Sequence, residues 1–249
     1  MKSGLVSITF RKLSPEKIVD LCVRAQLTGI EWGGDVHVPP GDPATAKRVA
    51  ALTRDAGLEV AAYGSYFRLG AQPVDEFAPV LDSASALRAP IIRVWAGKMG
   101  SASTDEPSWQ RTIDDGRAIA QLAADRDIRI ATEWHGHTLT DTAPAARRLL
   151  DGIDHPHFGT YWQPHQRMRF EDCLTDMETA LPRLLGVHVF HWDVQTVDKR
   201  PLAEGEHVWP TYLRKLGTAR PTYALLEFVR NDNPDQLLDD ARTLNGWLG

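Results

Sequence analysis

The residues best suited to chemistry in this chain lie in the stretch 128–141, where an apolar run ends abruptly in polar side chains. Ile128 and Ile130 indicate a buried strand, and Glu133 and His135 follow at its carboxyl end. Because side chains of an extended chain alternate between faces, Glu133 and His135 point to the same side. A carboxylate and an imidazole in this place are costly unless they are paired, hydrogen-bonded or bound to a metal ion. The stretch therefore indicates either a functional site or a strand end that simply reaches solvent.

The elements that must position these side chains follow one repeating pattern, a short apolar strand and then an amphipathic helix. The predicted strands cover residues 5–10, 30–32, 58–63, 90–97, 128–133, 158–163, 184–190 and 223–229. The predicted helices cover residues 15–25, 43–56, 74–87, 108–127, 142–150, 171–181, 207–215 and 235–248. Strands that alternate with helices predict a parallel sheet, and eight such units predict a closed (β/α)8 TIM barrel with outer helices. We expect residues 1–249 to form a single domain of this α/β class.

In such a barrel the chemistry gathers at the carboxyl ends of the strands. Four residues there come from four consecutive strands, namely Glu133, Gln163, His188 and Glu227. Carboxylate and amide oxygens with one imidazole suit a divalent ion such as Mn²⁺, Mg²⁺ or Co²⁺, with Zn²⁺ also compatible. Trp95 shares a face with Arg93 and is expected to form a wall of the pocket.

These residues also have structural interpretations. Glu133 or Glu227 is compatible with a buried ion pair to Arg93 or Arg230, and His188 with a core histidine bonded to the backbone. His135 and His165 are compatible with simple exposure on loops. The four candidate ligands are separated by 30, 25 and 39 residues, and these spacings match no local metal-binding motif. The prediction of a metal site therefore rests on the positions of the four residues at the strand ends of the barrel.

Composition limits the partners that the chain is expected to have. The formal net charge is -5 and no basic block occurs, which argues against a nucleic-acid partner. Two distant cysteines, Cys22 and Cys173, indicate reduced thiols and a cytoplasmic protein. No apolar run is long enough to predict a membrane span. The sequence is compatible with a homo-oligomer.

The chain resembles the xylose isomerase-like TIM-barrel superfamily, which includes sugar phosphate isomerases and epimerases. The resemblance covers the whole chain and rests on motifs at the strand ends. These motifs are GIEWGGDVH at 29–37, IRVWAG at 92–97, TEWHGHTLTD at 132–141, GTYWQPH at 159–165, GVHVFHW at 186–192 and LLEFV at 225–229. The resemblance implies a metal-dependent isomerase or epimerase that acts on a small carbohydrate, either a sugar or a sugar phosphate.

Family members hold a divalent ion with Glu, Asp, His and Glu from strands five to eight. Glu133, His188 and Glu227 match three of these ligands, and Gln163 is the best placement for the missing Asp, with Trp162 as the alternative. The resemblance further implies that one of Glu133 and Glu227 removes a proton next to a carbonyl, which gives a cis-enediolate, and that the other returns the proton. The residues expected to contact the substrate are Glu31, His37, Arg93, Trp95, His135 and His165.

The missing Asp leaves three other functions open. A lyase or dehydratase of a keto-sugar would form the same enolate and then expel a neighbouring substituent. A sugar-binding barrel with a degraded metal site would perform no reaction. An endonuclease IV-type repair enzyme fits less well, because it needs a three-metal cluster with further His and Asp ligands and a basic surface.

Overall fold

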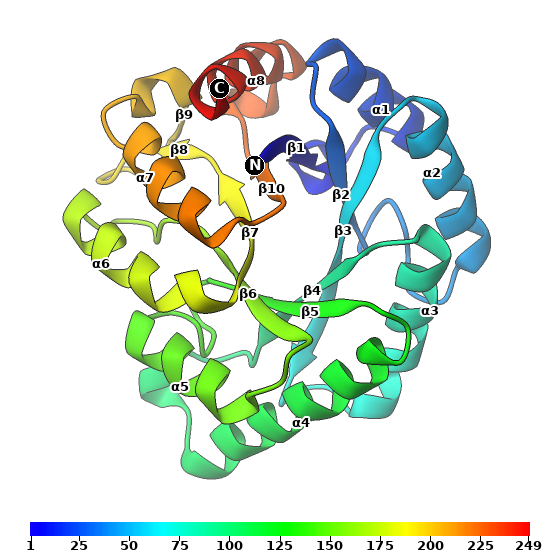
Figure 1. Cartoon of the computed structure of the whole chain (residues 1–249), viewed down its shortest axis with the longest axis vertical. Coiled ribbons are helices and arrows are strands. Elements are labelled where there is room, and N and C mark those ends of the chain that lie inside the picture. The colour runs from blue at the N-terminus through cyan, green and yellow to red at the C-terminus, as the bar shows by residue number, and fades with distance from the viewer.

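The computed structural model describes residues 1–249 and confirms the predicted (β/α)8 barrel. Eight parallel strands close in the spatial order β1-β10-β7-β6-β5-β4-β3-β2, and Figure 1 shows the helices as a ring around them. The barrel strands are β1 (Lys2–Val6), β2 (Gly29–Gly33), β3 (Glu59–Leu69), β4 (Ile91–Ala96), β5 (Arg129–Glu133), β6 (Phe158–Trp162), β7 (Leu184–Val189) and β10 (Tyr223–Leu226).

The outer helices begin where the sequence offers helix-start signals. Seven of the eight carry a proline in the first turn, where its missing N–H is not needed. Asp42, Asp105 and Thr142 each cap a helix by accepting a hydrogen bond from a backbone N–H three residues later. The helices are α1 (Pro15–Arg24), α2 (Pro43–Asp55), α3 (Ala78–Leu87), α4 (Glu106–Ala124), α5 (Ala143–Ile153), α6 (Phe170–Ala180), α7 (Trp209–Leu216) and α8 (Pro234–Leu248).

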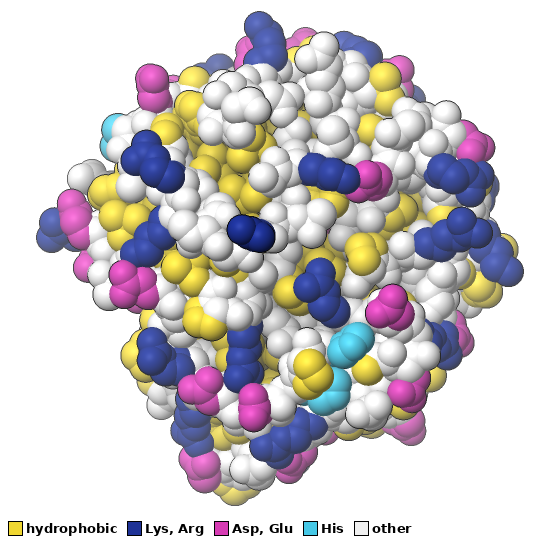
Figure 2. All heavy atoms as spheres, viewed as in Figure 1, with side chains coloured by type: hydrophobic (Ala, Val, Ile, Leu, Met, Phe, Trp, Pro, Cys, Tyr) yellow, Lys and Arg dark blue, Asp and Glu magenta, His cyan; other side chains and the backbone are white.

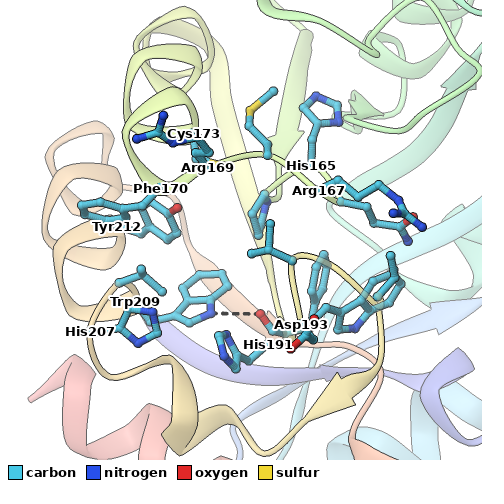
Figure 3. Close-up of a pocket in the computed structure, with 18 of the residues that line it drawn as sticks. His165, Arg167, Arg169, Phe170, Cys173, His191, Asp193, His207, Trp209 and Tyr212 are labelled. Atoms are coloured by element: carbon cyan, nitrogen blue, oxygen red, sulfur yellow. Dashed lines mark hydrogen bonds between the residues drawn. The ribbon is translucent and has the colours of Figure 1, made fainter.

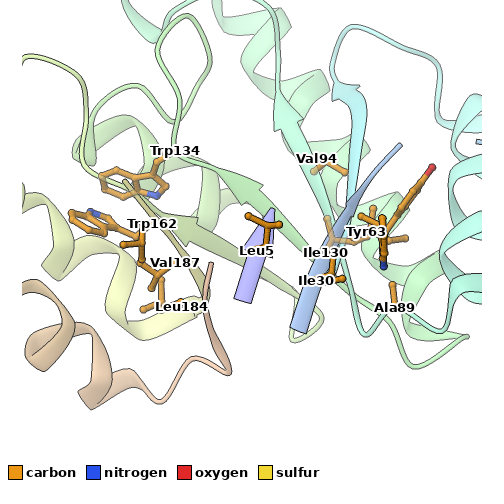
Figure 4. Close-up of a cluster of buried hydrophobic side chains, with 14 of the residues drawn as sticks. Leu5, Ile30, Tyr63, Ala89, Val94, Ile130, Trp134, Trp162, Leu184 and Val187 are labelled. Atoms are coloured by element: carbon orange, nitrogen blue, oxygen red, sulfur yellow. The ribbon is translucent and has the colours of Figure 1, made fainter. Parts of the chain in front are cut away.

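Apolar side chains fill two separate spaces. The larger cluster of 60 buried residues packs the strands against the helices, and Figure 4 shows part of it, including Ile130, Trp134 and Trp162. A second cluster of nine buried residues, among them Ala131 and Tyr161, is drawn from barrel strands and the segment after β1. This small apolar cluster leaves room inside the barrel for polar side chains at its carboxyl end.

Several predicted boundaries are wrong. The first strand was expected over residues 5–10, but Ser7–Phe10 is a 3₁₀ helix. There the Ser7 hydroxyl accepts a hydrogen bond from the Gly33 N–H and so ties the turn to the end of β2. The last barrel strand ends at Leu226, three residues earlier than predicted, while β3 runs on to Leu69 through a register shift.

The segment after β7 contains a hairpin that the sequence did not predict. Its strands, β8 (His191–Trp192) and β9 (Lys199–Arg200), pair in antiparallel fashion apart from the barrel. No helix is both long and apolar enough to cross a membrane. Figure 2 shows one face of the molecule, on which both acidic and basic side chains occur.

Candidate active site

A cavity of about 540 Å³ lies at the carboxyl end of the barrel. Its walls come from the last residues of the strands and from the loops that follow them, as is usual for TIM-barrel enzymes. The residues in its wall that bear on chemistry include Arg93, Trp95, Glu133, His135, Gln163, His165 and Glu227.

Three side chains at the base of this cavity form a candidate metal site. Glu133 is the last residue of β5, His188 lies in β7, and Glu227 directly follows β10. One potential ligand atom from each lies within 4.8 Å of the other two, and all three residues are buried. Glu227 Oε2 has no hydrogen-bond partner, although it lies 3.4 Å from His188 Nδ1. Two carboxylates and an imidazole that converge around an unpartnered buried oxygen fit a divalent cation.

Gln163 directly follows β6 and cross-links this group. Its amide nitrogen donates to the Trp134 carbonyl at 2.7 Å and to Glu133 Oε1 at 3.2 Å. Its amide oxygen lies 3.0 Å from His188 Nδ1. The structure therefore brings Gln163 into contact with two of the three candidate ligands, Glu133 through its amide nitrogen and His188 through its amide oxygen.

Arg93 neutralises the acidic side chains beneath the cavity. Its Nε donates to Glu31 Oε1 at 2.6 Å, and its Nη1 donates to Glu133 Oε2. Trp95 Nε1 donates to the same Glu133 oxygen at 3.0 Å. Glu31 Oε2 in turn lies 3.3 Å from His188 Nε2. Arg93 and His188 together give the buried carboxylates the partners that burial requires.

The pKa values in this layer follow from these contacts. Burial opposes ionisation of Glu31, but the positive charges of Arg93 and His188 outweigh it and lower the pKa of Glu31 to about 2. Burial likewise opposes charging of His188, but Glu227 and Glu31 outweigh it and raise the pKa of His188 to about 10. In the absence of a metal ion, the His188 imidazolium is therefore a second positive charge among the carboxylates, beside the Arg93 guanidinium.

The remaining predicted substrate contacts divide into two groups. Trp95, His135 and His165 line the cavity, and the His135 ring stacks on the Trp95 ring with centroids 4.5 Å apart. Glu31 does not line the cavity and instead supports Arg93 and His188 from below.

His37 has a structural contact where a substrate contact was expected. It is buried outside the cavity lining, with Nδ1 2.9 Å from Ser7 Oγ and Nε2 3.2 Å from the Leu13 carbonyl. Burial lowers the pKa of His37, consistent with a neutral ring that joins these loops.

Several polar residues in the cavity wall were not among the predicted site residues. Arg11, His137, Asp141 and Arg167 all line it and all come from loops beyond strand ends. Arg11 pairs with Asp35, which fixes its guanidinium at the mouth of the cavity. The only signal in the sequence was their position after a predicted strand, which does not tell which loop residues turn inward.

Residues 19–247 match the sequence model of a family described as xylose isomerase-like TIM barrel. A 3-dehydroshikimate dehydratase from Bacillus anthracis is 28% identical over 166 residues, which are 63% of this chain and 59% of that protein. That match therefore spans less than two thirds of the relative's length.

Solved structures share the whole barrel. The probable 3-DHS dehydratase involved in petrobactin synthesis from Bacillus anthracis superposes with a TM-score of 0.81 at 22% identity, covering 98% of this chain and 99% of that one. A D-psicose 3-epimerase solved in the presence of D-fructose gives 0.74 at 15% identity, with 99% and 98% covered. A barrel protein from Mycobacterium smegmatis in complex with magnesium gives 0.73 at 14% identity, with 99% and 97% covered. At these identities the similarity shows a common fold.

Proposed function

We propose, given that this chain belongs to the xylose isomerase-like TIM-barrel family, that it is a metal-dependent dehydratase of a polyhydroxylated carbonyl compound. In this proposal Glu227 removes the proton next to the carbonyl, and a hydroxyl group on the following carbon leaves as water. The observation that carries the proposal is the difference between the surroundings of Glu133 and Glu227.

Both oxygens of Glu133 are already engaged. Oε2 accepts hydrogen bonds from Arg93 and Trp95, and Oε1 accepts one from Gln163. Hydrogen bonds and a neighbouring cation stabilise the ionised form of a carboxylate and so weaken it as a base. Glu227 Oε2 lines the same cavity and accepts no hydrogen bond, and its one charged neighbour is the His188 ring at 3.4 Å, so it is held by fewer groups than Glu133. This asymmetry supports one base, Glu227, rather than two equivalent ones.

The residues that would hold the ion are Glu133, His188 and Glu227, with the Gln163 amide oxygen beside them. A bound divalent ion would polarise the substrate carbonyl and make the neighbouring C–H acidic. Glu227 then accepts this proton, the electron pair forms a carbon–carbon double bond, and the C–O bond on the next carbon breaks. His135, which lines the cavity, donates the proton with which the hydroxyl leaves as water. Trp95 and Arg93 hold Glu133 in place during these steps.

The sequence match to a 3-dehydroshikimate dehydratase supports elimination as the outcome. A second candidate is the isomerase or epimerase expected from the sequence. Two glutamates at one cavity and the fold shared with a D-psicose 3-epimerase favour it. In that reaction Glu133 would return the proton to carbon, which requires it to release its bonds to Arg93 and Trp95.

The two candidates differ in the mass of the product. The purified protein with Mn²⁺ is incubated in D₂O with 3-dehydroshikimate and with a panel of ketoses, and the products are analysed by mass spectrometry. A dehydratase gives a product that lacks one water, whereas an epimerase or isomerase gives a product of unchanged skeleton that carries deuterium. If no compound in the panel loses water and none exchanges faster than with the Glu227→Gln variant, both candidates are rejected.

A further inference from the structure

A second cavity of about 420 Å³ adjoins the candidate active site. Residues of the segment after β6 and of the β7–β8 segment line both cavities, among them His165, Arg167, Phe190 and Trp192. The two cavities are therefore neighbouring lobes with a common wall. We call the one that contains Glu133 and Glu227 the catalytic lobe and the other the side lobe.

The side lobe has aromatic walls. Phe170 at the start of α6 packs on Tyr212 of α7 with ring centroids 5.2 Å apart, and Trp209 packs on the same Tyr212 at 5.5 Å. Figure 3 shows these three rings on one side of the hollow, with His165 and Arg167 across from them. Trp209 and Tyr212 are almost fully buried, so the half-buried ring of Phe170 is the face that the lobe offers to another ring for stacking.

Hydrogen bonds tie the segments around the side lobe together. Trp209 Nε1 donates to the Phe190 carbonyl at 2.9 Å, which joins α7 to the end of β7. Arg167 Nη1 donates to the Gln195 carbonyl at 3.1 Å, which joins the segment after β6 to the β8–β9 hairpin. The lobe is therefore preformed, and a ligand does not have to assemble it.

The acidic groups at its rim are already paired. Asp193 lies 3.5 Å from Arg200, and Glu171 lies 3.5 Å from Arg169. Burial and the neighbouring His207 lower the pKa of His191, so this imidazole is neutral near neutral pH. The lobe thus offers aromatic surface without an unpaired acidic group, which favours a ring-bearing ligand that carries no positive charge.

We propose that the side lobe is a subsite for an apolar, ring-bearing substituent of the substrate. The substrate then has two parts, a polyhydroxylated carbonyl part in the catalytic lobe and an aromatic or similar ring in the side lobe. This inference rests on the proposed function for the first part only. A compact sugar would fill the catalytic lobe and leave the aromatic surface of the side lobe in contact with water.

The side lobe can be tested without turnover by using phenol as the probe. We expect saturable phenol binding in ligand-observed NMR, at millimolar concentrations, and a loss of at least about tenfold in affinity in Phe170→Ala because one stacking face is removed. Leu174→Ala is the matched control, since Leu174 is a half-buried residue on the same helix that does not line the lobe, and it should bind phenol as the wild type does. Absence of saturable binding, or equal affinity in Phe170→Ala and wild type, would overturn the proposal.

A second measurement tests whether the ring and the polar part belong to one ligand. In a series of phenyl glycosides that differ in the sugar, at least one member should bind about tenfold more tightly than phenol, because its sugar reaches the catalytic lobe. If no member exceeds phenol, the side lobe is not part of the substrate site and the inference is wrong. Phenol binding should persist in Glu227→Gln, so failure of the dehydratase chemistry leaves this result unaffected and the two failures are distinguishable.

Discussion

The Gln163 amide oxygen lies 3.0 Å from Nδ1 of His188, where the family resemblance places a carboxylate. The amide nitrogen on the other side donates to Glu133 Oε1. Gln163 thus joins two candidate metal ligands but contributes no charge of its own. A metal ion held here would be balanced by two carboxylates instead of three.

This relationship predicts that Gln163→Asp binds Mn²⁺ more tightly. A third carboxylate adds both a charge and a stronger oxygen ligand, and we expect an increase of at least about tenfold in affinity. Isothermal titration calorimetry on chelator-treated protein measures it. Gln166→Asp is the control, because Gln166 lines the same cavity and adds the same charge away from the ligand group. Equal gains in the two variants would show a general charge effect and would contradict a ligand position at 163.

The Glu31 carboxylate predicts a pH dependence of stability. Its pKa is lowered from 4.5 to about 2 in the folded protein, so the folded state binds fewer protons than the unfolded state between these values. The resulting stabilisation, about 3 kcal/mol, is fully present above about pH 5, and about 2 kcal/mol of it is lost by about pH 3.

Urea unfolding of the wild type and of Glu31→Gln at several pH values measures this contribution. The difference in unfolding free energy between the two proteins should shrink as pH falls below about 5. A difference that stays constant down to about pH 3 would show that Glu31 titrates normally in the folded protein.

Gly64 provides the space for the buried ion pair. A Cβ at this position would lie 2.7 Å from Glu31 Oε1 and 2.8 Å from Arg93 Nη2. Gly64→Ala should therefore force the pair apart and lower the free energy of unfolding by about 2–3 kcal/mol. Gly246→Ala in α8 is the control, because a Cβ there meets nothing within 4 Å and should change stability by no more than about 1 kcal/mol, in the favourable direction. Similar thermal stability of both variants would refute the packing argument.

Trp95 should act on catalysis through its N–H group. Its indole stacks between Arg68, 3.9 Å from the ring centroid, and His135, while Nε1 donates to Glu133. Trp95→Phe keeps a ring for stacking but loses this hydrogen bond, so we expect kcat to fall about tenfold with KM changed less than about twofold.

Trp109→Phe is the matched control for Trp95→Phe. Its indole also stacks with an arginine, Arg148 at 4.2 Å, but it lies in α4 outside both lobes. Steady-state kinetics on the substrate identified by mass spectrometry should show wild-type kcat for this variant. A loss confined to KM in Trp95→Phe would indicate that Trp95 only contacts the substrate.

The fold was predictable because local signals repeat along the chain. Prolines and caps mark the helix starts, and apolar strands such as β5 read clearly from their composition. The boundary errors arose where tertiary contacts decide. The apolar residues at 5–10 predict a strand, but the Ser7 hydroxyl accepts a hydrogen bond from the Gly33 N–H, and no local sequence pattern indicates that contact.

The sequence predicted which residues form the candidate site, but it did not predict which side chains they bond. The barrel register placed Glu133, His188 and Glu227 at one end, and the structure brings them together. The register could not show that Arg93 bridges Glu31 and Glu133. These glutamates are 62 and 40 positions away from Arg93 in the sequence, and the direction of each side chain depends on how the barrel closes. For the same reason His37, which follows a strand end, was expected in the cavity and instead bonds Ser7.

The proposed function is tested most directly by measuring whether Glu227 removes the substrate proton. On the compound that the wild-type protein converts, release of the substrate proton next to the carbonyl is followed by NMR in D₂O for wild type, Glu227→Gln and Glu133→Gln, each with saturating Mn²⁺ confirmed by metal analysis. We predict that Glu227→Gln loses at least about a thousandfold in exchange rate, and that Glu133→Gln retains measurable exchange. Exchange that survives in Glu227→Gln and disappears in Glu133→Gln would contradict the assignment of the base.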